Sequence, residues 1–531
     1  MTPHDLAHRL VEARRQHRPI DGLPSEQFPP DAATAYAIQQ AVIAGLGDST
    51  GAWKIGAKAP GGSTSGAPIP ASLVRASPAR VEHAGFFRVL VELEIAFRFT
   101  EVIEPRSRAY TRDEVLALVG ARSAPGARAA TFTVAGQVRR GLTEAGFSIE
   151  KRPGHGRKRE RLEARFPGRA GDPPALRRVA VVGAGIAGAS AARAVRALGG
   201  DALVFEAEAP GAGASGNQCA LVTPRLDAGL AAPARLFAAA FRRAVQLYQA
   251  CPQALIARGV LQLAIGPRVL DRFGRIAGSD LFEPDALSLI DAETAGARLG
   301  EPAPPCLDQA TALVIEPAPV LADWLGAPRI AEVADIVRSG DGWRLRDAAG
   351  AELAQAEAVI VAAGLGTAAL AASPPLQPVR GQASWAELSS PPPACAWGGY
   401  AVPTRNGVLF GATHDRGDTG REVRAGDHAR NLVTLGEALP QLAARLAGEG
   451  LEGRASLRAT SADRLPLAGE VGEGVFVLAG FGSRGFSLAP LLAEHVAALA
   501  MGAPGPLPAD QAELVDPRRF ARRAARRGLP G

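Results

Sequence analysis

The feature that most constrains the fold is a strand–turn–helix–strand pattern between about residues 176 and 206. Three glycines with GxGxxG spacing form its turn: Gly183, Gly185 and Gly188. Such a turn lets the backbone approach a pyrophosphate closely, and the following helix supplies free N–H groups and a positive dipole end. Glu206 ends the second strand about 20 residues after the turn, where a carboxylate can accept hydrogen bonds from a ribose diol. The pattern predicts a Rossmann-like dinucleotide site, and the acid at Glu206 disfavours NADP.

This unit alone leaves FAD and NAD open, and the downstream segments favour FAD. A long glycine-rich loop from Glu208 to Asp227 replaces the next helix, and a strand with a small-residue turn spans Val359 to Thr367. Residues Val475 to Ala500 have the pattern of another strand, glycine turn and helix, whose N–H groups can stabilise negative charge on a reduced flavin. The predicted cofactor contacts beyond the first turn are Ser215, Asn217, Gly364, Gly482, Ser483, Gly485 and Phe486.

The motifs of these segments resemble those of the D-amino-acid oxidase/glycine oxidase superfamily. The resemblance rests on GAGIAGAS, EAEAPGAGASGNQCAL, PVRGQ, LRATSADRLPLAG and GFGSRGFSLAPLLAE, and it covers roughly residues 176–505. ASGN at 214–217 and GSRGFSLAPLLAE at 482–494 narrow it to the FAD-dependent oxidoreductase half of the MnmC family. The resemblance implies an α/β fold, α+β overall, in which a Rossmann-like FAD domain is interleaved with an antiparallel-sheet substrate domain.

The same resemblance implies the oxidation of a modified tRNA nucleoside. The substrate, 5-carboxymethylaminomethyl-2-thiouridine at the wobble position, carries an N-substituted glycine. Oxidation of its methylene by FAD and hydrolysis of the imine would release glyoxylate and leave the aminomethyl form. Arginine suits a two-point grip on the glycyl carboxylate. The resemblance implies Arg458 and Arg484 as the catalytic residues, because they stand where glycine-oxidase-like enzymes keep such arginines. Arg380 in PVRGQ is predicted to form a structural ion pair, and His414 and Asp415 are assigned to a loop turn.

Two other interpretations fit the same segments. The first is an oxidase of free glycine, D-amino acids or sarcosine, which would form hydrogen peroxide and need no tRNA. The second is a non-catalytic product of gene rearrangement that still binds FAD or RNA. The two incomplete segments before residue 170 are its main support.

These two segments precede the oxidoreductase domain, which is assigned to residues 170–516. Residues 1–120 resemble a truncated 2-keto-4-pentenoate hydratase, in which Glu92 and Glu94 stand at the places of metal ligands. The sequence departs from that family before a third ligand, so no metal site is expected. Residues 121–169 resemble the C-terminal end of the MnmC methyltransferase half. No glycine-rich S-adenosylmethionine loop precedes residue 129, so the resemblance gives no basis for methyl transfer.

Positive charge is concentrated in two basic blocks, at residues 139–161 and 518–527, and the second belongs to a tail over 517–531. Such blocks are either solvated surface or a grip on phosphates, and the tRNA substrate implied by the resemblance favours phosphates. The start of the sequence lacks the pattern of a secretory signal, and no apolar stretch is long enough to cross a bilayer. The four cysteines are scattered without a CxxC pair. We therefore expect a cytoplasmic protein with isolated thiols.

Overall fold

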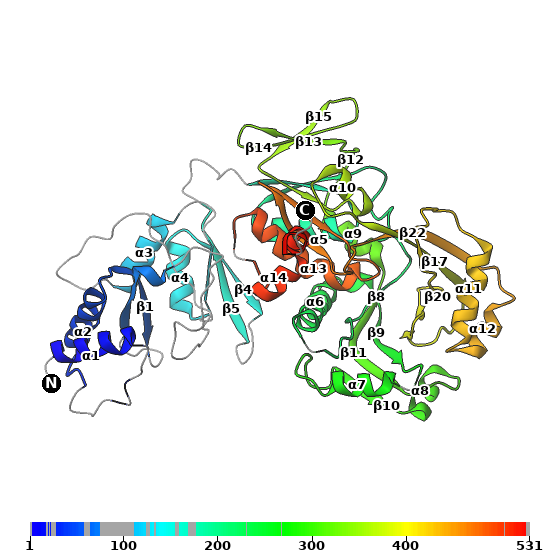
Figure 1. Ribbon diagram of the computed structural model, residues 1–531, viewed down its shortest axis with the longest axis horizontal. Helices are drawn as coiled ribbons and strands as arrows, with labels where there is room; N and C mark the ends of the chain where they lie inside the picture. Colours follow the sequence, from blue (N-terminus) through cyan, green and yellow to red (C-terminus); the bar gives the residue numbers. More distant parts are fainter. Residues whose placement is uncertain are drawn as a thin grey trace. The chain divides into compact units, whose positions relative to one another are not determined.

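The chain divides into two compact units, Met1–Pro174 and Ala175–Gly531. The computed structural model describes residues 3–16, 20, 22, 28–57, 64–74, 111–123, 128–131, 134–153, 159–167, 177–229, 231–266, 268–503 and 505–526. The first unit is built of short elements, and the second contains the large sheets (Figure 1). The predicted divisions after residues 120, 169 and 516 stay predictions.

The first unit begins with two helices that pack on each other. Helix α1 spans Pro3–Arg15 and α2 spans Ala32–Gly45, in agreement with the helical pattern of the sequence. Their apolar side chains recur every three to four residues and meet in a small buried cluster. Its members are Leu6, Ala7, Val11, Ile38 and Val42.

An antiparallel strand pair follows the two helices. It consists of β1 (Thr50–Ala57) and β2 (Thr64–Pro70), and a short helix, η2 (Ala71–Leu73), comes next. The expected strand with Glu92 and Glu94 lies outside the described residues. Among those that are described, no cluster of His, Cys, Asp or Glu could hold a metal ion.

The rest of the first unit is a three-stranded antiparallel sheet with two helices. The elements are α3 (Arg112–Arg122), β3 (Arg128–Thr131), α4 (Gly136–Glu144), β4 (Ser148–Pro153) and β5 (Glu160–Arg165). The sheet order is β3-β5-β4. Buried Leu142, Phe147, Leu162 and Phe166 fill the core between helix and sheet. The described residues of the predicted basic block at 139–161 therefore lie on and next to α4, β4 and the start of β5.

The second unit contains a six-stranded sheet in the order β12-β7-β6-β16-β24-β23, parallel except for β23. Its strands are β6 (Arg178–Val182), β7 (Asp201–Glu206), β12 (Arg329–Ile330), β16 (Ala358–Val361), β23 (Leu467–Gly472) and β24 (Val475–Ala479). In β6, Val179 and Val181 belong to the core shared with helices α5 (Ile186–Ala197) and α13 (Gly485–Ala500). Ala180 and Val182 face the opposite way, since side chains alternate along a strand.

That opposite face is covered by a small antiparallel layer. Its strands are β13 (Asp335–Ser339), β14 (Gly342–Arg346) and β15 (Glu352–Ala356). Leu345 of β14 and Ala356 of β15 are buried with Ala180 and Val182 in one cluster. The central strands are thus buried on both faces, which explains their continuous apolar sequences.

A ten-stranded, mainly antiparallel sheet forms the other part of the second unit. Its path is β10-β11-β9-β18-β19-β20-β17-β21, with β8 paired to β11 and β22 paired to β17. The strands are β8 (Ala220–Val222), β9 (Leu255–Leu263), β10 (Leu287–Ile290), β11 (Cys306–Ile315), β17 (Gln377–Glu387), β18 (Cys395–Ala396), β19 (Tyr400–Pro403), β20 (Gly407–Gly411), β21 (Asp415–Arg416) and β22 (Glu452–Thr460). They lie in sequence between β7 and β12 and between β16 and β23. The interleaved architecture expected from the sequence is confirmed.

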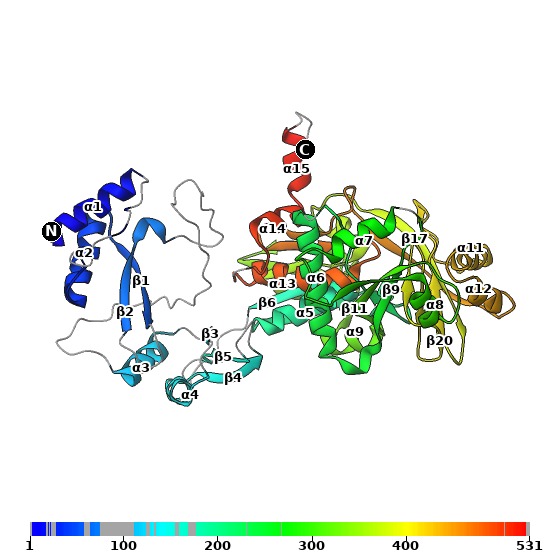
Figure 2. The same cartoon turned by 90° about the horizontal axis from the view of Figure 1, so that it is seen from below.

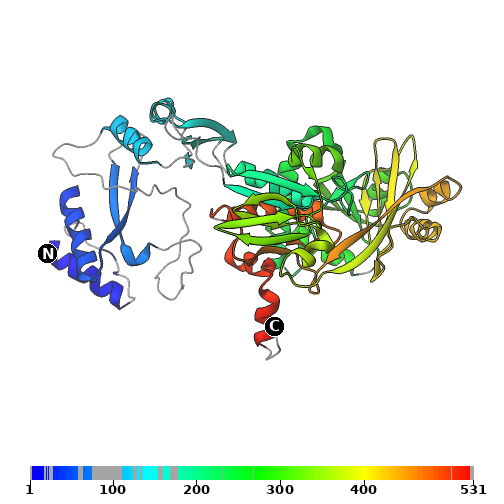
Figure 3. The same ribbon diagram turned by 90° about the horizontal axis from the view of Figure 1, so that it is seen from above.

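Helices complete the second unit. They are α6 (Ala232–Gln249), α7 (Val269–Ala277), α8 (Ala292–Leu299), α9 (Pro317–Leu325), α10 (Thr367–Leu370), α11 (Ala425–Gly436), α12 (Pro440–Leu446), α14 (Ala509–Val515) and α15 (Arg519–Arg526). Helices α11 and α12 pack on the ten-stranded sheet, and α15 projects from the body of the unit (Figures 2 and 3). None of the helices in the described part of the chain is long and apolar enough to span a membrane. All four cysteines are buried free thiols, as expected.

Candidate active site

The first glycine turn joins β6 to α5, and close contacts explain its glycines. Gly183 has a φ of +107°, which L side chains rarely adopt. A Cβ atom on Gly188 would lie 1.8 Å from the carbonyl oxygen of Gly183, and one on Gly183 would lie 2.5 Å from that of Ala362. A Cβ atom on Gly185 would lie 3.1 Å from Ser215 Oγ. The turn forms a cradle of backbone at the start of α5, as a pyrophosphate site requires.

Glu206 and Ser215 border this cradle. Glu206 Oε2 accepts a hydrogen bond from the Ala184 N–H at 2.6 Å, and Oε1 accepts one from the Glu208 N–H at 3.2 Å. Each carboxylate oxygen keeps acceptor capacity for a ribose hydroxyl, the role predicted for Glu206. Ser215 Oγ accepts the Ile186 N–H at 3.0 Å. Ser215 therefore satisfies one of the free N–H groups of α5 itself.

Arg454 on β22 holds the loop that contains Ser215 and Asn217, and nothing in the sequence pattern pointed to it. Its Nη2 donates to the carbonyl oxygens of Ala212 and Gly213, both at 2.7 Å. Its Nη1 donates to Asn217 Oδ1 at 3.3 Å. The predicted contact residue Asn217 is thus oriented by an arginine 237 residues away in the chain.

The second glycine turn joins β24 to α13 and meets the first turn. Gly480 and Gly482 have φ values of +76° and +56°. The Gly482 N–H donates to the Ala459 carbonyl of β22 at 2.9 Å. A Cβ atom on Gly485 would lie 3.1 Å from Ile186 Cγ2, so the N-termini of α5 and α13 lie side by side.

A third turn follows β16, where Gly364 has a φ of +57° in η5 (Gly364–Gly366). Because β6, β16 and β24 are neighbouring parallel strands, the three turns lie at one carboxyl edge of the sheet. Ligands of open α/β sheets bind at that edge. Ser483 is exposed and Phe486 is half-buried in the second turn. The structure therefore gathers the predicted cofactor residues, and their individual contacts stay predictions.

Arg458 and Arg484 lie on adjoining segments, because the end of β22 is bonded to the second turn. Arg458 Nη1 donates to the Thr413 carbonyl at 3.2 Å, and its guanidinium lies over Gly381 of β17. Arg484 Nη1 donates to the Pro224 carbonyl, also at 3.2 Å. A guanidinium carries five N–H donors, so each arginine keeps several for a ligand.

Both arginines are partly buried, and neither has a hydrogen-bonded carboxylate in the described part of the chain. Burial, and then the charge of Arg225, lowers the pKa of Arg484 to about 10. Burial also lowers the pKa of Arg458, against smaller opposing effects of Tyr400 and Asp415. Neither forms an ion pair with any carboxylate in the described ranges. Burying a charge that lacks a partner is unfavourable, so an anionic ligand would relieve both groups.

Arg380 differs from these two arginines. It is fully buried and pairs with Asp427, and its Nη2 donates to the Glu422 carbonyl at 2.6 Å. Asp427 also accepts from Arg430 at 3.0 Å. The predicted structural ion pair of Arg380 is confirmed.

Further polar groups surround Arg458. Burial raises the pKa of Tyr400, and the charge of Arg458 opposes this rise, which places the phenol near the guanidinium. Burial lowers the pKa of His414, and so do the charges of Arg458 and Arg416. Asp415 accepts hydrogen bonds from Arg430, which lower its pKa. Asp415 is therefore held in an ion pair, and Tyr400 is a site residue that the sequence pattern did not reveal.

The chain matches known families over two stretches. Residues 178–499 match the family described as FAD dependent oxidoreductase. Residues 107–167 match the family described as S-adenosyl-L-methionine-dependent methyltransferase. The glycine oxidase from Geobacillus kaustophilus shares the fold, with a TM-score of 0.55 at 24% identity over 63% of this chain and 97% of that chain.

Two relatives extend these matches over most of the chain. The tRNA 5-methylaminomethyl-2-thiouridine biosynthesis bifunctional protein MnmC of Caulobacter sp. (strain K31) is 54% identical over 433 residues, which cover 80% of this chain and 71% of the relative. The protein of the same name from Caulobacter vibrioides is 56% identical over 422 residues, with 80% and 70% covered. The backbone cradle of the first turn and the acid at its edge fit FAD. The chain is therefore an FAD-dependent oxidoreductase and belongs to the MnmC family.

Proposed function

We propose that this oxidoreductase removes the carboxymethyl group from 5-carboxymethylaminomethyl-2-thiouridine at the tRNA wobble position and leaves the aminomethyl form. The names of the MnmC relatives support a tRNA substrate, because they state the biosynthesis of 5-methylaminomethyl-2-thiouridine in tRNA. The proposed product, the aminomethyl form, lacks only the methyl group of that nucleoside. Methyl transfer is not part of the proposal, since only residues 107–167 match a methyltransferase family. A tRNA-modifying enzyme of this kind would act in the cytoplasm.

The observation that carries the proposal is a pair of partly buried arginines that form no ion pair within the described residues. Arg458 and Arg484 lie on the two segments that meet at the second glycine turn. The group to be oxidised is an N-substituted glycine, so its carboxylate is the anion that these arginines lack. A carboxylate held there would bring the adjacent methylene close to the flavin edge of the site.

The side chains around the site then have defined roles. FAD, when bound, supplies the acceptor for the hydride of the glycyl methylene, and water hydrolyses the resulting substrate imine to glyoxylate and the aminomethyl nucleoside. Arg458 and Arg484 fix the carboxylate and so orient the methylene. The free N–H groups of Gly485 and Phe486 at the start of α13 would stabilise the negative charge that a flavin gains on reduction. Tyr400 offers a hydroxyl beside Arg458.

Anaerobic flavin reduction tests the proposal. We expect tRNA bearing the carboxymethylaminomethyl group to reduce the flavin roughly 100-fold faster than glycine, sarcosine or D-alanine. Arg458→Met should slow that reduction about 100-fold with normal FAD content, because a hydrogen bond to a charged group contributes about 1.5–3 kcal/mol. The control Arg405→Met removes an exposed ion pair with Glu316 and should leave the rate unchanged.

Each alternative predicts a different result. Equal or faster reduction by free glycine or sarcosine would favour an oxidase of small amines, whose carboxylates the same arginines would bind. A flavin that none of these compounds reduces would favour the non-catalytic fusion.

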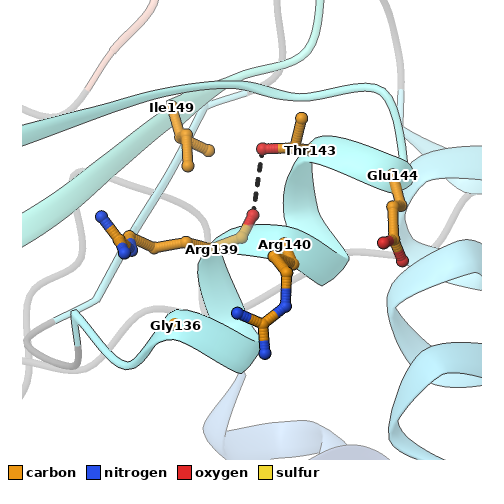
Figure 4. Close-up of a pocket in the computed structure, with 6 residues that line it drawn as sticks. All are labelled: Gly136, Arg139, Arg140, Thr143, Glu144 and Ile149. Atoms are coloured by element: carbon orange, nitrogen blue, oxygen red, sulfur yellow. Dashed lines mark hydrogen bonds between the residues drawn. The ribbon is translucent and has the colours of Figure 1, made fainter.

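The tRNA is further proposed to contact the first unit through the basic block 139–161. Arg139 and Arg140 extend from α4 in different directions and line a shallow hollow of roughly 230 Å³ with Gly136, Thr143, Ile149 and the acid Glu144 (Figure 4). Neither arginine has a hydrogen-bonded acid in the described part of the unit, so both are available to phosphates.

The block 518–527 is proposed as a weaker contact, because acids already neutralise much of its charge. Arg519 and Arg523 both pair with Asp463, at 2.9 and 2.6 Å. Arg518 pairs with Glu470 and Arg522 with Asp516. The exposed residues Arg416 and Arg464, which lower the pKa of His414 beside Arg458, are nearer candidates for phosphates of the anticodon.

The salt dependence of the tRNA binding constant measures how much each of these basic surfaces contributes to tRNA binding. Removal of one arginine that binds a phosphate should reduce the slope of log K against log salt by about 1. We expect this reduction for Arg416→Gln and Arg140→Gln, and a smaller one for Arg522→Gln. A binding constant that barely changes with salt in the wild-type protein would contradict tRNA binding through these surfaces.

A further inference from the structure

The N-terminal helical turn of α13, which follows the second glycine turn, lacks one of its internal hydrogen bonds. Pro490 lies inside this helix, and a proline nitrogen carries no hydrogen. The carbonyl four residues earlier, that of Phe486, therefore has no donor within the helix. Tyr248 of α6 supplies it, with its hydroxyl donating to the Phe486 carbonyl at 2.8 Å.

Tyr248 is held firmly in the position that this bond requires. It is 1% exposed and stacks on Trp324 of α9, with ring centroids 5.3 Å apart and planes within 10°. The guanidinium of Arg193 of α5 lies over the Trp324 ring, 5.5 Å from its centroid. Arg193 also forms an ion pair with Glu494 of α13. Burial raises the pKa of Tyr248, so its hydroxyl keeps its proton and remains a donor.

A second set of hydrogen bonds joins the N-terminal turn of α13 to the loop that contains Thr223. Ser487 Oγ donates to the Thr223 carbonyl at 2.8 Å and lies 3.2 Å from the Thr223 N–H. The Ser487 and Leu488 N–H groups both donate to the Arg484 carbonyl at 3.1 Å. The N–H groups of Gly485 and Phe486 remain, as expected for the first residues of a helix.

We propose that Tyr248 is a positioning residue that sets the N-terminal turn of α13 against the flavin by replacing the hydrogen bond that Pro490 removes. The inference rests on the role given above to the start of α13. With the Tyr248 hydroxyl in place, the free N–H groups of Gly485 and Phe486 and the backbone of Arg484 keep a fixed orientation. Without it, the Phe486 carbonyl is an unsatisfied buried acceptor, and the turn rotates toward another donor.

Tyr248→Phe tests this role, because it keeps the ring and its stack but removes the donor. We expect normal FAD content and an about tenfold fall in the equilibrium constant for flavin reduction against a reference dye, which is about 30 mV for a two-electron couple. The double variant Tyr248→Phe/Pro490→Ala should regain the wild-type potential, because an alanine N–H at position 490 can donate to the Phe486 carbonyl. If the single variant loses FAD, recovery of FAD in the double variant is the expected result.

The matched control is Phe241→Leu, which loosens the same helix, α6, at a buried ring that packs against Phe282 and makes no hydrogen bond to the Phe486 carbonyl. It should lower the midpoint of thermal unfolding and leave the flavin potential unchanged. An unchanged potential in Tyr248→Phe, no rescue by Pro490→Ala, or the same shift in Phe241→Leu would each overturn the inference. No tRNA is present in these measurements, so their outcome is separate from that of the proposed substrate.

Discussion

The two glycine turns of the site have the same strand–turn–helix form but are held in place differently. The first turn is closed mainly by its neighbours, since Gly188 packs on Gly183 and the acid at its edge lies 22 residues from its partner Ala184. The second turn depends on α6 and the β8–α6 loop, with Tyr248 and Thr223 lying 238 and 264 residues from their partners. A cradle for phosphates can thus be encoded locally, whereas the orientation of the second turn depends on the assembled fold.

The largest effect is expected where the first turn packs on itself. Gly188→Ala would place a Cβ atom 1.8 Å from the Gly183 carbonyl oxygen, and such overpacking typically costs 1–3 kcal/mol or more. We expect at least a roughly tenfold loss of bound flavin per chain, measured by absorbance of the purified protein.

Gly213→Ala is the matched control for this prediction. It lies in the loop beside the same turn, and a Cβ atom there would meet nothing within 4 Å. Normal flavin content in Gly188→Ala would show that the local packing of the first turn is not what forms the cradle.

A smaller effect is expected from a distant side chain that supports the loop beside the first turn. Arg454→Met removes the hydrogen bonds to the carbonyls of Ala212 and Gly213 and to Asn217. We expect the Kd of FAD to rise about tenfold, or roughly 1.4 kcal/mol, with an unchanged flavin potential. Titration of the apoprotein with FAD measures the Kd. Arg421→Met, which removes an exposed ion pair with Glu208, should change neither quantity.

A shift of flavin potential in Arg454→Met would remove the distinction between the two turns, because it would mean that the first turn also tunes the flavin. An unchanged Kd would mean that the loop keeps its form without a distant support.

The same distinction explains what the sequence could predict. The β6–α5–β7 unit, its glycine spacing and Glu206 were predictable because the contacts of Gly188 and Glu206 with this turn span a few dozen residues at most. The interleaved sheets were expected from the family resemblance, and Arg380 was assigned to its ion pair. Arg454, Tyr248 and Tyr400 could not be found this way. Each acts on a segment far away in the chain, and no periodicity or spacing encodes such a contact.

The smallest effect is expected in the C-terminal half of the helix that follows the second turn. His495 of α13 is buried, and a Cβ atom on Gly505 would come within 2.6 Å of its Nδ1. Burial lowers the pKa of His495 from 6.5 to about 4, against an opposing effect of Asp516. The unfolded chain therefore binds this proton more readily than the folded protein. The stabilising effect of the neutral ring is present above pH 6.5 and is lost as the pH falls toward 4.

Between pH 7 and pH 6 this difference should lower the free energy of unfolding by less than about 1 kcal/mol. Thermal unfolding at the two pH values measures it, and His495→Leu should reduce the dependence. The flavin potential of His495→Leu at pH 7 should match that of the wild type, because the start of α13 is held by Tyr248 and Thr223 rather than by its far end. A shifted flavin potential would mean that a change at His495 displaces the start of α13 as well. The orientation of the second turn would then depend on the packing of the whole helix rather than on its hydrogen bonds to Tyr248 and Thr223.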